Sequence, residues 1–162
     1  LTEGLEAFPG DINLLYARSL ASEKMGDIAA VERDLRAILD KDSDNAAALN
    51  ALGYSLANHS TRYEEAQSLI ERALALQPND ASIIDSLGWV LYRRGQPDAA
   101  LAQLRRAAAL LTDPEVAAHL GEVLWSTGDS EQARAVWREA LQQHPDDPLI
   151  KATLERLNAG PL

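Results

Sequence analysis

Small and apolar residues recur along this chain with a period of about 34 residues. Leu-Gly pairs stand at Leu52-Gly53, Leu87-Gly88 and Leu120-Gly121, so that successive pairs are 35 and 33 residues apart. Alanines follow each pair at two further fixed distances. They are Ala66, Ala100 and Ala133, then Ala73, Ala107 and Ala140. A fixed period of this length indicates a repeat protein, in which each repeat is one supersecondary unit.

The spacing inside one repeat predicts a pair of helices. With Ala46 as position 1, and with one extra residue around His59 left out of the count, apolar or small residues occupy positions 4, 7, 8 and 11, then positions 20, 24 and 27. Steps of three and four residues place side chains on one helical face, and the period of two that a strand needs is absent. The residues in question are Leu49, Leu52, Gly53, Leu56, Ala66, Ile70 and Ala73.

Glycine and proline mark the expected helix ends. Gly26, Gly95 and Gly128 stand where a first helix must end, and they suit the left-handed position after its last residue. Asp113-Pro114 and Asp147-Pro148 each offer an N-cap followed by proline at the first helical position, the position that Pro97 takes in another helix.

The glycines of the Leu-Gly pairs lie inside predicted helices, where glycine costs about 1 kcal/mol against alanine. We expect a close approach of the two helices of each repeat to compensate for this cost. On this hypothesis Ala66, Ala100 and Ala133 lie opposite the three glycines.

These residues resemble the tetratricopeptide repeat family over nearly the whole chain. Two central repeats carry the family's small residues at positions 8, 20 and 27 together, and Pro78 adds the proline at position 32. The resemblance implies an all-α fold, a right-handed superhelical solenoid of antiparallel helix pairs with a C-terminal capping helix.

The repeat positions divide the chain into six segments. Residues 1–11 would end a preceding repeat, and 148–162 would form the capping helix and tail. Between them we expect one degenerate repeat, with Arg18 at position 7, and then three regular ones. The first regular repeat has an extra residue around His59, which predicts a longer turn between its two helices. The four repeats are 12–45, 46–80, 81–113 and 114–147.

A narrower resemblance concerns Asp85–Trp89 and Ala118–Trp125. Both look like the C-terminal repeats of large proteobacterial tetratricopeptide proteins, some of which are lipoproteins of the outer membrane. The resemblance implies a piece of a longer protein on the periplasmic side of that membrane, with the cytoplasm as the alternative. It also implies an adaptor for a periplasmic carboxyl-terminal processing protease.

Charge and composition exclude several classes of function. The net charge is −10 and the isoelectric point about 4.7, so the basic footprint of a nucleic-acid-binding protein is missing. The chain has no cysteine, which excludes disulfides and thiolate metal sites. No apolar run reaches the ~20 residues that cross a bilayer, so we expect no membrane insertion of this segment.

Catalytic motifs are absent from the sequence. There is no nucleophile elbow, phosphate-binding loop or dinucleotide fingerprint. His119 and Glu122 stand one helical turn apart, a spacing that metal sites use, but no third ligand converges on them. We therefore expect a chain that is not an enzyme and needs neither a cofactor nor a metal.

Positions 2, 5, 9 and 12 of each first helix form a second stripe, beside the packing positions. In the family this stripe lines the concave groove that binds extended peptides, and here it collects most of the aromatic residues of a chain with 5% aromatics. Trp and Tyr dominate binding hot spots. The candidate groove residues are Tyr16, Asn50, Tyr54, Asp85, Trp89, Tyr92, Arg93, His119, Glu122 and Trp125.

Several alternatives stay open at this stage. Trp89 and Trp125 are equally placed to pack between neighbouring repeats, whereas Trp137, at position 24, is expected in the core. The residues of the family's carboxylate clamp are missing, and the acidic stripe favours a neutral or basic apolar segment of a protein partner. The competing function is self-assembly into a homo-oligomer through the degenerate repeat or the capping helix.

Overall fold

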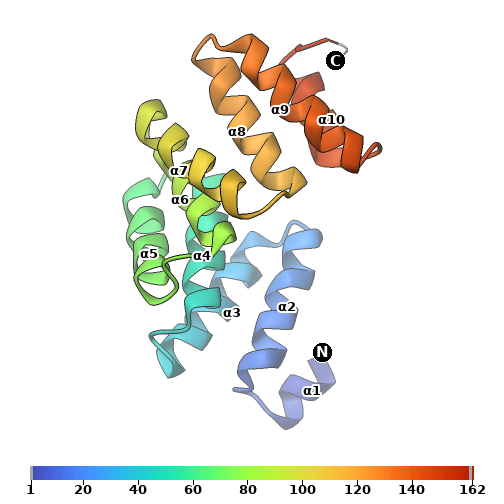
Figure 1. The fold of residues 1–162 in the computed structure, drawn as a ribbon. Coiled ribbons are helices and arrows are strands. Elements are labelled where there is room, and N and C mark those ends of the chain that lie inside the picture. The colour runs from blue at the N-terminus through green and yellow to red at the C-terminus, as the bar shows by residue number, and fades with distance from the viewer. Residues whose placement is uncertain (1, 161) are drawn as a thin grey trace. The chain divides into compact units, whose positions relative to one another are not determined.

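Ten helices make up the part of the chain that the computed structural model describes, residues 2–160 and 162 (Figure 1). Strands are absent from those residues, so the fold is all-helical as predicted. In chain order the helices are α1 (Thr2–Ala7), α2 (Ile12–Lys24), α3 (Ile28–Lys41), α4 (Ala46–His59), α5 (Tyr63–Leu76), α6 (Ala81–Arg93), α7 (Pro97–Leu110), α8 (Pro114–Ser126), α9 (Ser130–Gln143) and α10 (Pro148–Arg156).

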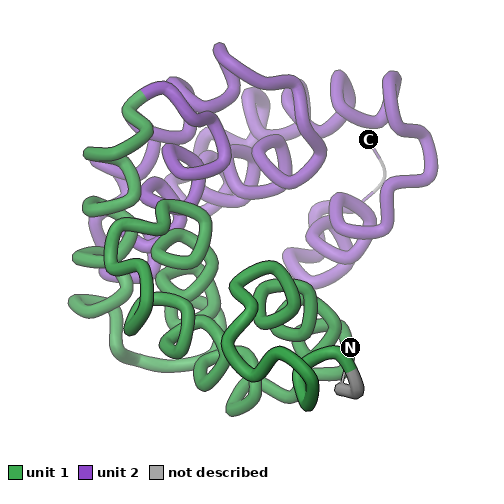
Figure 2. The backbone as a smooth tube through the Cα atoms, turned by 90° about the horizontal axis from the view of Figure 1, so that it is seen from below, with its two compact units in different colours: residues 1–78 green, residues 79–162 purple. Residues whose placement is uncertain are grey.

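The helices gather into two compact units, residues 1–78 and 79–162, which Figure 2 colours green and purple. The sequence predicts one continuous array over 1–162, with a repeat boundary between residues 80 and 81. Repeat arrays hold together only through neighbouring repeats, so they divide readily near such a boundary. The first unit holds the pairs α2/α3 and α4/α5, and the second holds α6/α7 and α8/α9.

Three-residue turns join the two helices of each pair. Gly26, Gly95 and Gly128 lie in three of these turns with φ of 74°, 75° and 92°, which confirms the left-handed positions. The extra residue near His59 does not lengthen its turn, contrary to our prediction. It extends α4 to 14 residues, whereas α2, α6 and α8 have 13.

Side-chain caps begin most of the helices. An Asp or Asn carboxyl or amide oxygen accepts from a backbone N–H of the first turn in seven of them, and such a cap stabilises a helix by about 1 kcal/mol. The predicted proline at the first helical position is present in α7, α8 and α10. The capping residues are Asp11, Asp27, Asn45, Asp80, Asp113, Asp129 and Asp147.

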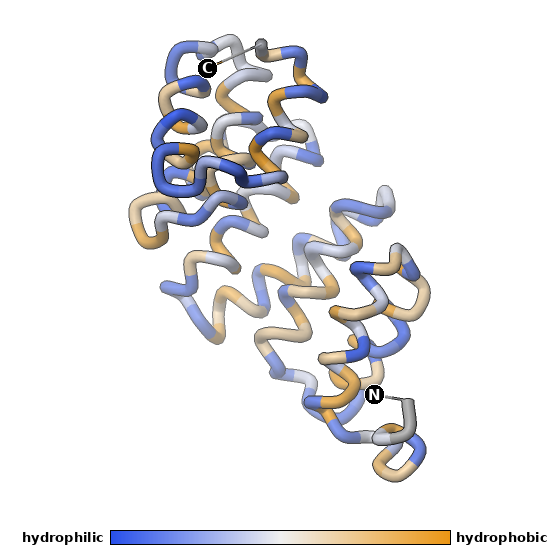
Figure 3. The backbone as a smooth tube through the Cα atoms, turned by 90° about the vertical axis from the view of Figure 1, so that its right-hand side faces the viewer, coloured by the Kyte–Doolittle hydropathy of each residue, from blue (hydrophilic) through white to orange (hydrophobic). Residues whose placement is uncertain are grey.

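The core of each pair consists of the apolar positions that the repeat pattern predicts. All of the residues named for the repeat 46–80 are buried, and so is Trp137. Apolar and polar residues alternate along the helices of both units, so that each helix has one face for the core (Figure 3). This arrangement explains why the pattern was readable from the sequence.

The helix glycines pack against position 24, not chiefly against the alanines we expected. A β-carbon on Gly53 would lie 2.6 Å from Ile70 Cγ1, and 2.8 Å from the backbone oxygen of Ala66. At Gly88 the nearest atom would be Leu104 Cγ, at 2.6 Å. At Gly121 the three nearest atoms would all belong to the Trp137 indole. The larger side chain reaches the glycine first, because the alanine is too short to fill the space.

The degenerate repeat replaces apolar packing by an ion pair. Arg18, at position 7, donates from Nε and Nη2 to the two carboxylate oxygens of Asp34, at 2.6 and 2.7 Å. Burial raises the pKa of Asp34, but the bonds from Arg18 and Arg33 outweigh it and hold that pKa below its usual value. Val31, Leu35 and Ile38 of the same repeat are buried.

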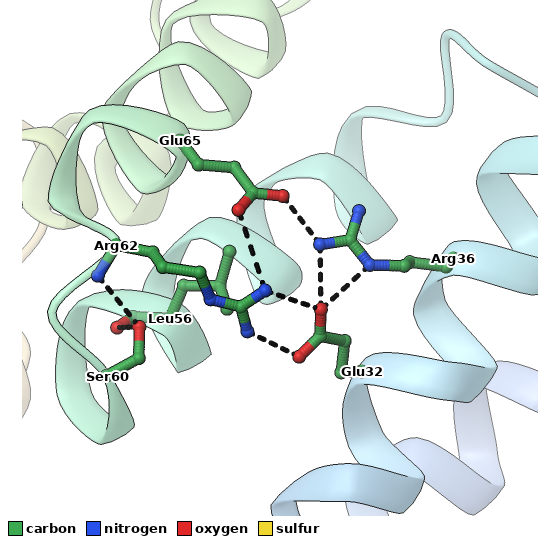
Figure 4. Close-up of polar contacts among 6 residues, drawn as sticks. All are labelled: Glu32, Arg36, Leu56, Ser60, Arg62 and Glu65. Carbon is green, nitrogen blue, oxygen red and sulfur yellow. Dashed lines mark hydrogen bonds and ion pairs between the residues drawn. The ribbon is translucent and has the colours of Figure 1, made fainter.

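Four charged side chains join the two repeats of the first unit (Figure 4). Arg62 donates to both oxygens of Glu32, at 2.9 and 2.5 Å, and Arg36 donates to Glu32 and to Glu65, at 2.8 and 2.5 Å. The bonds from Arg62 lower the pKa of Glu32 from 4.5 to about 2, against the opposing effect of burial. The network links α3 with the start of α5, and nothing in the repeat pattern predicts it.

The last helix covers α8, as a capping helix should. Ile150 and Thr153 of α10 are buried, whereas Lys151 and Glu155 are exposed. The tail is held as well, because Arg134 of α9 donates a hydrogen bond to the backbone oxygen of Ala159. The Arg156 side chain is 56% exposed and also turns toward α8, where it pairs with Glu122.

Candidate functional site

Six of the ten candidate groove residues come together in the second unit. Asp85, Trp89 and Tyr92 lie on successive turns of α6, and Arg93 ends that helix. His119 and Glu122 lie on α8, which packs against α6. Asp85, Trp89, Tyr92 and Glu122 stand at stripe positions 5, 9, 12 and 9, whereas Arg93 and His119 border the stripe at positions 13 and 6. They come together because α6 and α8 are the first helices of neighbouring repeats.

A buried pair joins the two helices at the base of this cluster. His119 Nδ1 lies 2.8 Å from Asp85 Oδ2, and the two side chains are only 7% and 5% exposed. Burial lowers the pKa of His119, but the charge and hydrogen bond of Asp85, with Glu115 and Glu122, raise it by more. The net pKa is therefore above its usual value of 6.5, which favours an imidazolium–carboxylate pair.

The ring of Trp89 covers one side of the His119–Asp85 pair. Its ring stacks on the His119 imidazole with centroids 4.2 Å apart and an angle of 19°. The Tyr92 ring contacts the same indole, with ring centroids 5.5 Å apart. Trp89 is thus largely buried between α6 and α8, and Tyr92 remains half-buried beside it.

Glu122 is paired by a residue that the sequence analysis did not assign to the groove. Arg156 of α10 donates from Nη1 and Nη2 to the two oxygens of Glu122, at 2.9 and 2.5 Å. The Glu122 side chain is 8% exposed, but that of Arg156 is 56% exposed. Counting repeat positions onward from Pro148 places Arg156 at position 9, level with Trp89 and Glu122, and this count would have found it.

An open pocket of about 520 Å³ lies above these residues, entirely within the second unit. Its lining combines an aromatic wall with charged groups from three helices. Such a mixture of apolar surface and a few convergent polar groups is typical of binding sites. The lining residues are Trp89, Tyr92, Arg93, Glu122 and Arg156.

Trp125 does not reach this pocket's lining. Its ring packs against Trp137, with centroids 5.9 Å apart, and Arg134 lies over it at 5.5 Å from the ring centre. Trp125 is half-buried and belongs to the packing between α8 and α9. These contacts lie within one repeat, and so differ both from a place in the pocket and from the expected packing between neighbouring repeats.

The other three candidates, Tyr16, Asn50 and Tyr54, belong to the first unit. Each is half-buried, Tyr16 on α2 and the other two on α4. Burial, with a smaller effect of Glu23, raises the pKa of Tyr16. The amide oxygen of Asn50 is buried and has no hydrogen-bond partner among the described residues.

Two acidic groups of the second unit's stripe already have basic partners within the chain. Asp85 is paired with His119, and Glu122 is paired with Arg156. These two pairs reduce the acidic character on which the expectation of a neutral or basic partner segment rests.

No metal-binding cluster and no membrane span occur in the part of the chain that the structure describes. Groups of three or more His, Cys, Asp or Glu side chains placed to hold an ion are absent from it. Its helices are also too short or too polar to cross a bilayer.

Comparison with known proteins decides the family. The profile of the tetratricopeptide repeat family matches residues 13–154. The chain belongs to the tetratricopeptide repeat family. Arrays of this family generally serve as scaffolds for interactions between proteins, and they are typically not catalytic.

One relative is similar over much of the chain, the TPR repeat-containing protein PA4667 of Pseudomonas aeruginosa. It is 52% identical over 122 residues, which are 75% of this chain but only 21% of that protein. The chain therefore spans about a fifth of the relative's length.

Solved structures share the fold. TTC0263, a thermophilic TPR protein of Thermus thermophilus, has a TM-score of 0.84 at 23% identity, covering 96% of this chain and 86% of its own. YrrB, a TPR protein with an unusual peptide-binding site, has a TM-score of 0.65 at 22% identity, covering 98% of this chain and 84% of its own. At these identities the likeness concerns the fold alone.

Proposed function

We propose that this chain is a scaffold whose second unit binds an extended segment of a partner protein. The face formed by α6, α8 and α10 would receive the segment. The observation that carries the proposal is the open pocket of about 520 Å³, in which Trp89 and Tyr92 form an apolar wall beside the heads of Arg93 and Arg156. Tyr, Trp and Arg are the residues that most often dominate binding energy.

The rigidity of the site supports the same proposal. Trp89 is held from below by the His119–Asp85 pair, and Arg156 is held by both oxygens of Glu122. Side chains that are already ordered lose less entropy when a ligand binds. The fold of YrrB, a protein with a peptide-binding site, is compatible with a peptide ligand here.

The test starts from peptides selected on the protein itself. A phage-displayed random peptide library is panned on the immobilised chain, and enriched peptides are labelled for fluorescence anisotropy. Tyr92→Ala should weaken their binding at least about tenfold, as expected for a central aromatic contact. Tyr63→Ala is the matched control, because Tyr63 is also a half-buried tyrosine but lies on α5 of the first unit. Equal binding by the wild-type chain and Tyr92→Ala would refute the proposed site.

A finer proposal concerns the full-length protein. Following the resemblance of the repeats around Trp89 and Trp125, we propose an adaptor in the bacterial cell envelope that presents a periplasmic carboxyl-terminal processing protease with its substrates. The test is reconstitution with that protease purified from the same bacterium. Proteolysis that is unchanged by the addition of the full-length protein would argue against it.

Self-assembly remains the second candidate, and one observation favours it. Leu20 and Met25 of the degenerate repeat are 43% and 76% exposed. Exposed apolar surface of this kind is available for an interface between proteins. Multi-angle light scattering from 1 to about 300 μM protein distinguishes the two candidates. A constant mass of 17.6 kDa would exclude assembly of this chain by itself.

A further inference from the structure

The charges that line the pocket are unequal. Two guanidinium groups, those of Arg93 and Arg156, stand against the single carboxylate of Glu122. The other carboxylate of the cluster, Asp85, lies beneath Trp89 and is engaged by His119. Two basic side chains therefore line this pocket, on a chain whose net charge is −10.

Arg156 retains the capacity to hold a second acceptor. A guanidinium carries five N–H groups in a planar fork, and Glu122 accepts from one hydrogen on each of Nη1 and Nη2. Three N–H groups, including the one on Nε, lie outside this bidentate pair. With 56% of its side chain exposed, Arg156 can offer them toward the pocket while Glu122 fixes the plane of the fork.

Tyr92 contributes a different donor to the same space. Its phenol lines the pocket, and it lies near enough for its ionisation to influence Arg156. A tyrosine hydroxyl donates one hydrogen bond and leaves its ring as apolar surface. The pocket thus combines anion donors with an aromatic wall, a pairing that suits a carboxylate carried on a short apolar stem.

We propose that this pocket receives an Asp or Glu side chain of the bound partner segment, held by Arg156, Tyr92 and Arg93 against the face of Trp89. The inference rests on the proposed function, because it specifies the ligand of the same site. Arg156 of α10 then binds the partner segment and also links α10 to α8.

A basic side chain does not fit the same arrangement. To reach Glu122, a Lys or Arg of the partner would have to displace Arg156 from a bidentate pair, and would do so beside a second guanidinium. Only the Glu122 side of this pair is buried, but the incoming cation would have to replace two charge-assisted hydrogen bonds that Arg156 already makes to both carboxylate oxygens. An acidic side chain needs no such exchange and adds to the existing pairs.

The test uses three blocked peptides that differ at one residue. They are acetyl-Ala-Phe-Glu-Phe-Ala-amide and its Gln and Lys counterparts, so none has a terminal charge. Each is titrated into the ¹⁵N-labelled chain, and NMR shifts of the Trp89 indole and Arg156 Nε signals are followed. We expect the Glu peptide to bind about tenfold more tightly than the Gln peptide, since hydrogen bonds between charged groups are about twice as strong as neutral ones. The Lys peptide should bind more weakly still.

Variants then assign the preference to Arg156. The double variant Glu122→Gln/Arg156→Gln removes both charges together, so that no buried carboxylate is left without its partner and the fold is kept. It should reduce the preference for Glu over Gln to about twofold or less. Arg138→Gln is the matched control, because Arg138 is an exposed arginine of α9 outside the pocket lining, and it should keep the full preference.

The outcomes separate this inference from the proposed function. If all three peptides shift the Trp89 signal with equal affinity, the site binds peptides but the acidic preference is wrong. A tighter Lys peptide would likewise overturn the inference alone. If no peptide moves the Trp89 or Arg156 signals at millimolar concentration, both the inference and the proposed site fail.

Discussion

Replacing Gly121 by alanine should destabilise the second unit more than the equivalent change at Gly88 in the preceding repeat. Gly121 lies at position 8 of α8, directly beneath the indole of Trp137. A β-carbon there would come within 2.7 Å of Nε1, Cε2 and Cδ1 of that ring. The ring is rigid and completely buried, so it has no free rotamer and no solvent to move into.

The expected loss follows from three contributions. Alanine is a better helix former than glycine by about 1 kcal/mol, which stabilises the variant. Atoms normally approach to about 3.5 Å, so the clash amounts to roughly 1 Å or more, and overpacking of a core costs about 1–3 kcal/mol. Partial expulsion of a fully buried indole costs about 2 kcal/mol more. We expect a net loss of about 2–4 kcal/mol.

Gly88→Ala is the comparison that isolates the role of the rigid ring. There the β-carbon would meet Leu104 Cγ at 2.6 Å and Cδ2 at 2.9 Å, and a leucine side chain can rotate away. The gain in helix propensity offsets much of that cost, which leaves an expected net loss of about 0–2 kcal/mol.

The assay is urea unfolding followed by circular dichroism at 222 nm and by tryptophan fluorescence. Trp137→Leu, which installs the residue type found at Leu104, completes a double-mutant cycle with Gly121→Ala. The two changes should couple favourably by at least about 1 kcal/mol, as expected for residues in contact. If Gly121→Ala is as stable as the wild-type chain, the close approach of α8 and α9 does not require glycine at this position.

Three further predictions concern the charged groups. The pKa of His119 is raised in the folded chain, so its stabilisation should be complete below pH 6.5 and disappear as the pH rises through the raised value. Urea midpoints measured from pH 6 to 9 should show this fall, and His119→Gln should flatten it. Glu32 has a pKa of about 2 in place of 4.5, so it should stabilise the first unit above pH 4.5 and lose that contribution as the pH falls toward 2. In acid titrations followed by circular dichroism, Glu32→Gln should remove this pH dependence. Asp34→Asn should cost about 2–3 kcal/mol in urea unfolding because Arg18 loses its buried partner, whereas the exposed Asp40→Asn should cost almost nothing; equal losses would contradict the role of the ion pair.

The helix pairs, their ends and their apolar faces could all be predicted from the sequence. Gly26, Gly95 and Gly128 mark turns because only glycine takes a positive φ without strain, and this is a local property of the chain. Asp113-Pro114 marks a helix start for an equally local reason. The repeat period then assigned buried positions, since three- and four-residue steps fix which side chains share a face.

The candidate site was only partly predictable. The stripe positions and the polar residues beside them supplied Asp85, Trp89, Tyr92, Arg93, His119 and Glu122, which do gather in the second unit. They did not reveal that Asp85 and Glu122 are already paired, since partners 34 residues away in the sequence are set by the packing of α6, α8 and α10. They also placed Trp125 in the groove, whereas Trp137 and Arg134 hold that ring in the packing between α8 and α9.

The sequence by itself therefore determined the repeat, the helices and the face that each helix buries, because these depend on spacing along one chain. Only the tertiary structure decided which charges neutralise one another and which remain to meet a ligand. Arg156 illustrates the difference. On its own helix it is one more polar residue, and the packing of that helix on α8 turns it toward Glu122 and makes it part of the pocket.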